Sequence, residues 1–313
     1  MVTMDLAIVG AGTMGAGVAQ VAVTRGLAVT LYDAVPTALE RGVQRIHEAL
    51  GRDVQRGRLS AEEHDTALAH LCAARSLDDL AAAPFVLEAA PEDLGIKREV
   101  FAGLDGVCAP GAILASNTSS IPITAIAAGS MHPGRVAGMH FFNPVPALPL
   151  VEVIAGHLTD EATVAAVIAL ARRLGKTPVR ARDTPGFIVN RVARPFYGEA
   201  LRILAEGTDA ATVDRVMRAA GFKMGPFELM DLIGIDVNFA VTRSVYEAFF
   251  GEPRYRPHPI QAQMVAAGTL GRKTGQGFYS YDDAGHEQGG GQSRNEGQSR
   301  NEGQNEGGAD AQR

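Results

Sequence analysis

A glycine-rich turn near the start of the chain constrains the fold more than any other feature. Residues 6–9 are apolar and lead into Gly10-Ala11-Gly12-Thr13-Met14-Gly15, which an apolar helical segment follows at 16–25. A second apolar segment, 28–32, ends at Asp33. The pattern G-x-G-x-x-G is weak evidence alone, but between a strand and a helix, and with an acid after the next strand, it indicates a dinucleotide-binding unit. The sequence therefore predicts an α/β fold with a Rossmann-type, doubly wound and mostly parallel sheet.

The glycines of this turn each have a physical reason. Gly10 permits the tight turn, Gly12 lets the backbone approach a pyrophosphate, and Gly15 lets the helix pack against the strand. The free N–H groups at the start of the helix, at Thr13 and Met14, would face the phosphates. The alternative interpretation is a glycine-rich turn that binds no ligand.

Asp33 indicates which dinucleotide the turn would bind. Its carboxylate can accept hydrogen bonds from the hydroxyls of the adenosine ribose. The same carboxylate would repel a 2′-phosphate, so the pattern predicts NAD as the cofactor and not NADP.

Composition and charge exclude several classes of protein. The chain has 313 residues, of which 46% are hydrophobic and 20% charged, as in a soluble globular protein of about two domains. Its net charge of -6 argues against a general nucleic-acid-binding protein. No apolar run approaches the roughly 18 residues of a membrane span. We therefore expect neither nucleic acid nor a membrane as a partner.

The cysteines and the N-terminus bear on the compartment. Cys72 and Cys108 lack the spacing of metal ligands, so we expect no metal site, and both residues should lie in the interior of a protein from a reducing compartment. The first strand begins near Asp5, which leaves no room for a targeting segment. A cytoplasmic location is expected.

Polar side chains follow later strands of the predicted sheet. Further strands are predicted at 85–90, 111–116, 135–140 and 177–180, with a helix at 160–174. The carboxyl ends of parallel strands meet at one crevice. The polar turn 117–120 follows one of these strands and His140 ends another, so Ser119 and His140 can converge there.

A proline-rich turn at 143–149 separates His140 from Glu152. Proline lacks an N–H group and fixes φ, so this turn cannot be helical. Two short strands joined by the turn could bring His140 and Glu152 side by side, where a carboxylate fixes the tautomer of the imidazole and stabilises its charged form. The stretch predicts a general acid/base pair. The alternative is a structural histidine at the end of a strand.

Two groups of charged residues in the first half have an ordinary interpretation. A polar helix is predicted at 36–55 and a second helix at 61–71, with a break at Gly57 between them. Arg52, Arg56 and Arg58 lie around this break, and the ordinary interpretation of such a group is a solvated face. A helix is predicted to begin at Pro91, and Glu92 and Lys97 lie in or beside it. Their ordinary interpretation is a salt bridge on the helix surface.

The second half of the chain is predicted to be helical. The alternation of strands and glycine turns stops at Gly186, and helices are expected at 188–206, at 210–220 and from 226 onward. Asn190, in the first turns of the first of these helices, could point back at the crevice. More apolar residues follow than a small helical domain needs to cover itself, namely Leu229, Leu232, Ile233, Val237 and Phe239.

These patterns divide the chain into three parts. Residues 1–184 form an NAD-binding Rossmann domain, and 185–284 form a helical C-terminal domain with part of the substrate cleft. Residues 285–313 carry no large apolar residue and contain Gln-Ser-Arg-Asn-Glu-Gly twice, at 292–297 and 298–303, so we expect a disordered tail.

Three long motifs occur along the chain in a familiar order. They are Ser116-Asn117-Thr118-Ser119-Ser120, then His140-Phe141-Phe142-Asn143-Pro144-Val145-Pro146 with Leu150-Val151-Glu152-Val153, then Asp183-Thr184-Pro185-Gly186-Phe187-Ile188-Val189-Asn190-Arg191. Together they resemble the signature of the L-3-hydroxyacyl-CoA dehydrogenases, over about residues 5–281. Residues 191–197 and 231–242 are similar to bacterial members that act on 3-hydroxybutyryl-CoA and 3-hydroxyadipyl-CoA.

The resemblance implies roles for particular residues. The catalytic pair would be His140 and Glu152, with Ser119 and Asn190 as polar partners that also contact the substrate. Further cofactor contacts would come from Glu92 and Lys97 beside the nicotinamide ribose, and from Asn117, Ser119, Asn143 and Lys273. Arg52 and Arg56 would lie near the CoA moiety, and the helical domain would form a homodimer.

The sequence thus predicts an NAD-dependent enzyme that reversibly oxidises (S)-3-hydroxyacyl-CoA to 3-oxoacyl-CoA. A substrate with a terminal carboxylate would need a buried cation, for which Arg191, Arg194 and Arg243 are candidates. One alternative is a dehydrogenase of a free hydroxy acid or sugar acid on the same scaffold, against which the intact residues 141–144 speak. Another is an NAD-binding protein without turnover.

Overall fold

The computed structural model describes residues 4–282, and its contacts divide the chain into two compact units. The first unit ends at Val192 and the second begins at Ala193. This division falls inside helix α7 (Val189–Ala205), so the first residues of that helix belong with the first unit. The tail predicted at 285–313 lies outside the described residues.

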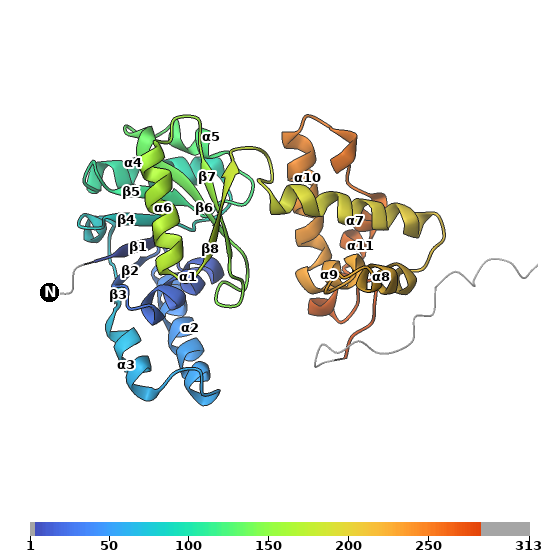
Figure 1. Cartoon of the computed structure of the whole chain (residues 1–313), viewed down its shortest axis with the longest axis horizontal. Helices are drawn as coiled ribbons and strands as arrows, with labels where there is room; N and C mark the ends of the chain where they lie inside the picture. Colours follow the sequence, from blue (N-terminus) through green and yellow to red (C-terminus); the bar gives the residue numbers. More distant parts are fainter. Residues whose placement is uncertain (1–3, 283–313) are drawn as a thin grey trace, which may run out of the picture. The chain divides into compact units, whose positions relative to one another are not determined.

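The first unit is built on an eight-stranded sheet with the order β3-β2-β1-β4-β5-β6-β7-β8 (Figure 1). The strands are β1 (Leu6–Val9), β2 (Val29–Tyr32), β3 (Leu71–Ala73), β4 (Phe85–Glu88), β5 (Ile113–Ser116), β6 (Val136–Phe141), β7 (Leu150–Ala155) and β8 (Thr177–Arg182). Neighbouring strands are parallel except β6 and β7. The strand order reverses between β1 and β4, which confirms the predicted doubly wound fold and places a crevice at the carboxyl ends of these strands.

Helices cover both faces of this sheet. Those on one face are α1 (Thr13–Thr24), α2 (Pro36–Gln55), α3 (Ala61–Ala69) and α6 (Glu161–Arg173), and those on the other are α4 (Leu94–Val107) and α5 (Ile123–Ala127), with the short turns η1 (Leu77–Leu80) and η2 (Pro133–Arg135). In β1, Leu6 and Ile8 pack into one core while Ala7 and Val9 pack into the other. Successive strand side chains point to opposite faces, so a strand covered on both faces has to be apolar throughout.

The edge of the sheet differs from the prediction. The helix expected at 61–71 ends at Ala69, and residues 71–73 pair in parallel with β2 as strand β3. Cys72 was expected in the interior, but it is exposed because β3 is an edge strand, whereas Cys108 is buried as expected. Three residues are too few to show a strand pattern in the sequence.

Helix α4 begins later than predicted. Asp93 caps it, since its Oδ1 accepts the backbone N–H of Ile96 at 2.9 Å, so Pro91 precedes the helix instead of opening it. Glu92 is therefore part of the preceding loop, and its side chain can reach the neighbouring turn at 118–120.

The second unit is helical, as predicted. Besides most of α7 it contains α8 (Ala210–Ala219), α9 (Pro226–Ile233), α10 (Ile235–Ala248) and α11 (Pro259–Ala267), with the short turns η3 (Pro253–Tyr255) and η4 (Arg272–Thr274). Its core is formed by Tyr197, Ala200, Leu201, Val213, Phe227, Met230 and Ile235. Leu232, Ile233 and Val237 are 49%, 42% and 47% exposed. These side chains are the apolar excess that the sequence indicated, and a homodimer through them stays a prediction.

A buried carboxylate fastens the last described segment, 271–281, to the second unit. Asp231 accepts the backbone N–H groups of Phe278 and Tyr279, both at 3.0 Å, and the hydroxyl of Tyr281 at 2.9 Å. Burial raises the pKa of Asp231, although these three donors lower it in part. Three of the contacts that hold the segment therefore converge on one side chain, which lies about four dozen residues earlier in the chain.

Gly277→Ala should weaken this fastening. A Cβ at Gly277 would lie 2.1 Å from Oδ1 of Asp231, so the methyl group would displace the carboxylate from its donors. We expect the free energy of unfolding to fall by about 2 kcal/mol and Tm to fall by about 4 °C or more, measured by thermal unfolding. Gly198→Ala is the matched control in the same unit, because the nearest atom to its Cβ is 3.9 Å away and alanine suits a helix interior. Equal Tm values for Gly277→Ala and the wild type would contradict this role of Asp231.

Candidate active site

The glycine turn between β1 and α1 is shaped by close packing at two of its glycines. Gly10 has a φ of 105°, and a Cβ there would lie 2.5 Å from the carbonyl oxygen of Ala89. A Cβ at Gly15 would lie 1.8 Å from the oxygen of Gly10. A Cβ at Gly12 would meet nothing within 4 Å, and no side chain caps the first N–H groups of α1. The turn thus fits a dinucleotide pyrophosphate above Gly12, at the exposed helix start formed by Thr13 and Met14.

Asp33 is fixed beside this turn. Its Oδ2 accepts the backbone N–H of Ala11 at 2.8 Å, and its Oδ1 accepts that of Val35 at 2.9 Å. A carboxylate has about four acceptor sites, so two remain for other donors. The position at the end of β2 therefore fits the ribose hydroxyls of a dinucleotide.

Glu88, which the sequence analysis did not single out, organises the crevice from the end of β4. It is fully buried, and its Oε1 accepts Nζ of Lys97 and the N–H of Ala90, both at 2.6 Å. Its Oε2 accepts the hydroxyl of Ser116 at 2.5 Å. Lys97 is only 1% exposed, so the interpretation of Lys97 as part of a surface salt bridge is wrong. An acid that ends an apolar strand at the crevice was the available signal for Glu88.

Glu92 gathers the polar turn that follows β5. Its Oε1 accepts the hydroxyl of Thr118 at 2.8 Å and the backbone N–H groups of Ser119 and Ser120 at 2.8 and 3.0 Å. Lys97 lies 3.4 Å from its other oxygen. Burial raises the pKa of Glu92, but Lys97 and the donors of the turn outweigh it and hold that pKa below its ordinary value. The structure therefore places Glu92 and Lys97 together, directly against Ser119.

His140 and Glu152 form a buried pair. The antiparallel register of β6 and β7 sets them opposite one another, and His140 Nδ1 lies 2.7 Å from Glu152 Oε2. His140 is 5% exposed and Glu152 is fully buried. An ionised carboxylate only accepts hydrogen bonds, so the contact selects the tautomer with the proton on Nδ1 and leaves Nε2 as a proton acceptor.

The second oxygen of Glu152 anchors the start of α7. Its Oε1 accepts the backbone N–H groups of Ile188 and Val189 at 2.8 and 2.9 Å. A negative charge at a helix N-terminus is favourable. Asp183 fastens the same segment from its other end, because its Oδ1 accepts the N–H of Ile123 at the start of α5, at 2.8 Å. Two carboxylates thus fix the segment that leads to Asn190.

The remaining polar residues meet at the end of β6. Asn190 donates from Nδ2 to the backbone oxygen of Ser119 at 3.5 Å. Asn117 accepts the N–H of Phe141 at its Oδ1, at 2.8 Å. The structure therefore brings Asn117, Ser119 and Asn190 together in the first unit, beside the strand that carries His140.

Two aromatic side chains flank the histidine. The ring centroids of Phe142 and Phe187 lie 4.5 and 5.7 Å from that of His140. Phe187 is buried and has a φ of 46°, a conformation that favours glycine and costs of order 1 kcal/mol for a bulky residue. The sequence analysis did not single out Phe187. Both rings limit the access of water to the buried pair.

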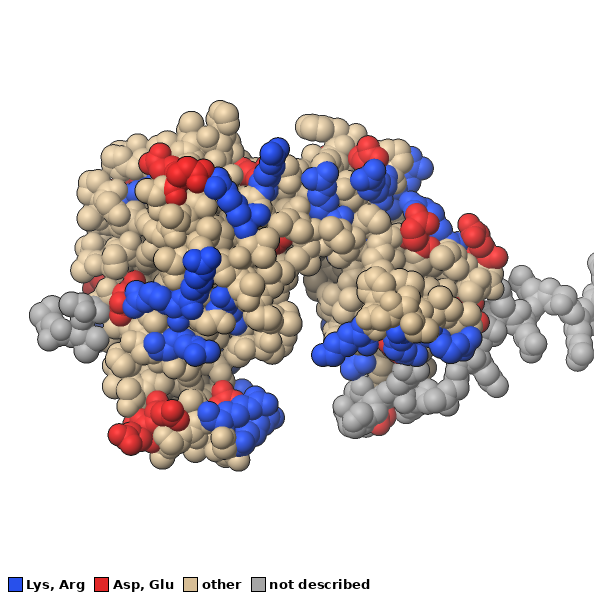
Figure 2. All heavy atoms as spheres, viewed as in Figure 1, with Lys and Arg blue, Asp and Glu red and all other residues tan. Residues whose placement is uncertain are grey.

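Other predicted site residues lie elsewhere. Arg52 and Arg56 are exposed near the end of α2. Figure 2 shows basic side chains on one side of the tip that α2 and α3 form, and acidic side chains on its other side. Asn143 is exposed in the proline-rich turn. Lys273 lies in the second unit, where its Nζ is 2.5 Å from Asp236. The cofactor or CoA contacts of these four residues stay predictions.

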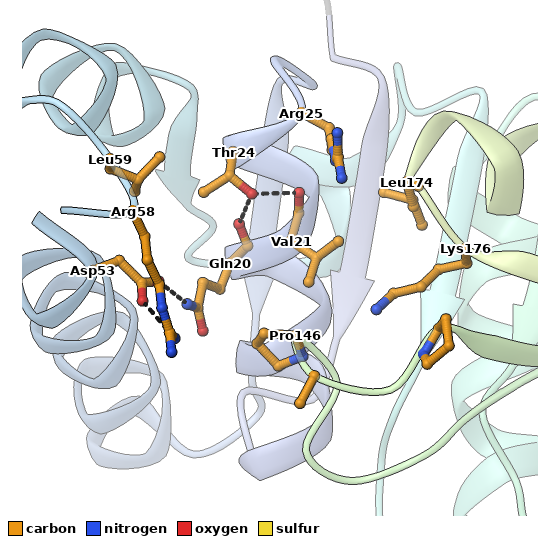
Figure 3. A pocket seen from close by; sticks show the side chains of 13 residues that line it. Gln20, Val21, Thr24, Arg25, Asp53, Arg58, Leu59, Pro146, Leu174 and Lys176 are labelled. Atoms are coloured by element: carbon orange, nitrogen blue, oxygen red, sulfur yellow. Dashed lines mark hydrogen bonds and ion pairs between the residues drawn. The ribbon is translucent and has the colours of Figure 1, made fainter. Parts of the chain in front are cut away.

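A cavity of about 390 Å³ opens over α1, between the end of α2 and the turn at 146–149. Figure 3 shows Arg58 and Asp53 on one side of it and Lys176 on the opposite side, with α1 between them. Its cations are Arg25, Arg58 and Lys176, and Asp53 is the one acid among the lining residues that the structure describes. Burial lowers the pKa of Lys176, and the nearby Arg25 lowers it further. The balance of charge in this cavity favours an anion.

Residues 4–282 offer neither a membrane-spanning helix nor a metal-binding cluster. No helix in this range is long and apolar enough to cross a membrane. The same residues contain no cluster of three or more His, Cys, Asp or Glu side chains arranged to hold a metal ion.

Comparisons with known proteins identify the family of the chain. Residues 5–184 match the NAD-binding domain of 3-hydroxyacyl-CoA dehydrogenase, and residues 186–281 match its C-terminal domain. The chain belongs to the 3-hydroxyacyl-CoA dehydrogenase family, whose members are NAD-dependent oxidoreductases.

Individual relatives are similar over nearly all of the described chain. The 3-hydroxyadipyl-CoA dehydrogenase of Escherichia coli is 50% identical over 88% of this chain, which spans 58% of that protein's length. A probable 3-hydroxybutyryl-CoA dehydrogenase of Bacillus subtilis is 42% identical over 89% of this chain and 98% of its own. The crystal structure of (S)-3-hydroxybutyryl-CoA dehydrogenase from Ralstonia eutropha has a TM-score of 0.85 at 42% identity and covers 90% of this chain and 99% of its own.

Substitutions of the buried pair should separate chemistry from cofactor binding. His140→Gln should lower kcat by about two to four orders of magnitude, the usual contribution of a positioned acid/base. In Glu152→Gln one side-chain atom becomes a donor, so the group can no longer accept both from Nδ1 of His140 and from the start of α7. We expect a lower kcat with nearly unchanged affinity for NADH, measured by steady-state kinetics and NADH titration. Full kcat of Glu152→Gln across the pH range would rule out the pairing.

Proposed function

We propose that this chain reversibly oxidises (S)-3-hydroxyacyl-CoA to 3-oxoacyl-CoA with NAD, and that His140 is its acid/base catalyst. The observation that supports the proposal is the buried contact of 2.7 Å between His140 and Glu152 at the carboxyl end of β6. A pair shielded by two aromatic rings suits proton transfer, because a charge that forms on the imidazole is not screened by water.

The proposed chemistry divides between this pair and the cofactor. Bound NAD supplies the acceptor for the hydride that leaves C3 of the substrate. Nε2 of His140 takes the proton of the 3-hydroxyl group, and Glu152 stabilises the imidazolium that forms. In the reverse direction the same imidazolium returns the proton to the oxygen of the 3-oxo group. Hydrogen is thus lost from the alcohol as one proton and one hydride.

Ser119 and Asn190 would orient the substrate. The backbone of Ser119 is fixed by Glu92, and Asn190 is fixed through the start of α7, so both side chains can be held in place before the substrate arrives. We propose that they bind the 3-hydroxyl and the thioester oxygen. Orientation of this kind lowers the entropic part of the barrier.

The cavity over α1 is the proposed site for the phosphates of CoA. Its three cations, Arg25, Arg58 and Lys176, outnumber the one acid, although Arg58 lies 3.4 Å from Asp53 and Nζ of Lys176 already donates to the backbone oxygens of Val145 and Leu148. The surplus of positive charge suits phosphates. Arg52 and Arg56 stay candidates for further contacts on the adjacent surface. We further propose a short-chain or dicarboxylic acyl group, such as 3-hydroxybutyryl or 3-hydroxyadipyl, and a cytoplasmic homodimer that covers Leu232, Ile233 and Val237.

Three acetoacetyl substrates test this assignment. The oxidation of NADH should be fast with acetoacetyl-CoA, slower with acetoacetyl-pantetheine, which lacks the nucleotide, and near background with free acetoacetate. Free acetoacetate that matches the CoA thioester would favour a dehydrogenase of free hydroxy acids.

Arg58→Gln tests the cavity in the same assay. Removing one charge-assisted contact should raise KM for acetoacetyl-CoA by roughly tenfold while leaving the constants for acetoacetyl-pantetheine unchanged. The control is Arg75→Gln, an exposed arginine of the first unit that does not line the cavity. An equal loss with both thioesters would place the phosphates elsewhere.

A further inference from the structure

A second, much smaller cavity lies inside the helical unit. Its volume is about 10 Å³, close to the space that one water molecule or a similarly compact group needs. Three arginines line it, Arg194, Arg254 and Arg256, and so does His258, whose pKa is lowered by burial and by the nearby Arg202, so that it adds no charge at neutral pH. No Asp or Glu lines it within the part of the chain that the structure describes. The cavity therefore concentrates positive charge in a chain that is acidic overall.

Arg194 is the buried cation of this cavity, and no acid lies beside it. It is 5% exposed, and its Nη1 donates to the backbone oxygen of Asn238 and to the hydroxyl of Thr242, both at 3.0 Å. Both of these acceptors are neutral, and its Nε is buried without a hydrogen-bond partner. Burial lowers the pKa of Arg194 to about 10, so the group still carries its charge at neutral pH. A buried cation without an anion is costly, and this one is only partly compensated by the ring of Tyr197, 4.9 Å from its Cζ.

The residues around Arg194 supply further hydrogen-bond donors but no carboxylate. The side-chain Nδ2 of Asn238 is also buried without a partner, while its Oδ1 accepts Nε2 of Gln261, which lines the cavity. Arg254 and Arg256 are exposed, and neither forms an ion pair within residues 4–282. The unmet need at this place is thus for a small negatively charged acceptor.

We propose that this cavity binds one compact monoanion, a carboxylate group or a halide, against the guanidinium of Arg194. The anion comes from solution. Among the arginines considered for a terminal carboxylate, Arg243 is exposed and pairs with Glu247, whereas Arg194 has no acid beside it.

Thermal unfolding of the full chain tests the site in solution. At constant ionic strength, chloride, formate or acetate should raise Tm by about 5 °C near saturation relative to a bulky organic sulfonate. Arg194→Met, which replaces the cation by an apolar side chain of similar length, should remove this difference. Arg215→Met, at an exposed arginine of α8, should keep it. A wild-type crystal soaked in bromide should show an anomalous peak beside Arg194. This measurement tests the site even if Arg194→Met does not fold.

Two results would overturn the proposal. One is the same Tm in compact and bulky anions together with no bromide at Arg194. The other is a Tm that depends on protein concentration and not on the anion, which would indicate a carboxylate from a second copy of the chain.

Discussion

The carboxylate of Glu152 holds two separate parts of the site at once. One of its oxygens orients the imidazole of His140, and the other accepts the first backbone N–H groups at the start of α7. A fully buried carboxylate is tolerated only with such a complete set of donors. The same group therefore selects the tautomer of the histidine and fixes the segment that carries Asn190.

A second network of buried charge organises the opposite side of the crevice. Glu88 binds Lys97 and Ser116, while Glu92 gathers the turn that contains Ser119. Each carboxylate sits at the carboxyl end of a parallel strand or in the loop that follows it, where the doubly wound sheet leaves space for a ligand. The glycine turn and Asp33 lie on the same edge, so one sheet edge carries both the proposed nucleotide site and the proposed catalytic pair.

Much of this arrangement could be predicted from the sequence, because it depends on local patterns. Three features could be interpreted from neighbouring residues alone, without any distant contact. They are the apolar run of β1, the glycine turn and the proline-rich turn after His140. The features that could not be predicted from the sequence depend on contacts between residues far apart in the chain. Nothing in the spacing of Lys97 shows that it is buried against Glu88, and β3 is too short to have a pattern. Likewise, the role of Asp231 follows from donors that come much later in the chain.

We propose that Glu152 keeps the ring proton of His140 on Nδ1 and so leaves Nε2 free to act on the substrate. The most direct measurement is ¹⁵N NMR of the histidine ring nitrogens at neutral pH, with the His140 signals assigned by their loss in His140→Gln. The account predicts a protonated Nδ1 and an unprotonated Nε2 in the wild type, and a loss of this preference in Glu152→Gln. A proton on Nε2 of His140 in the wild-type protein would contradict it.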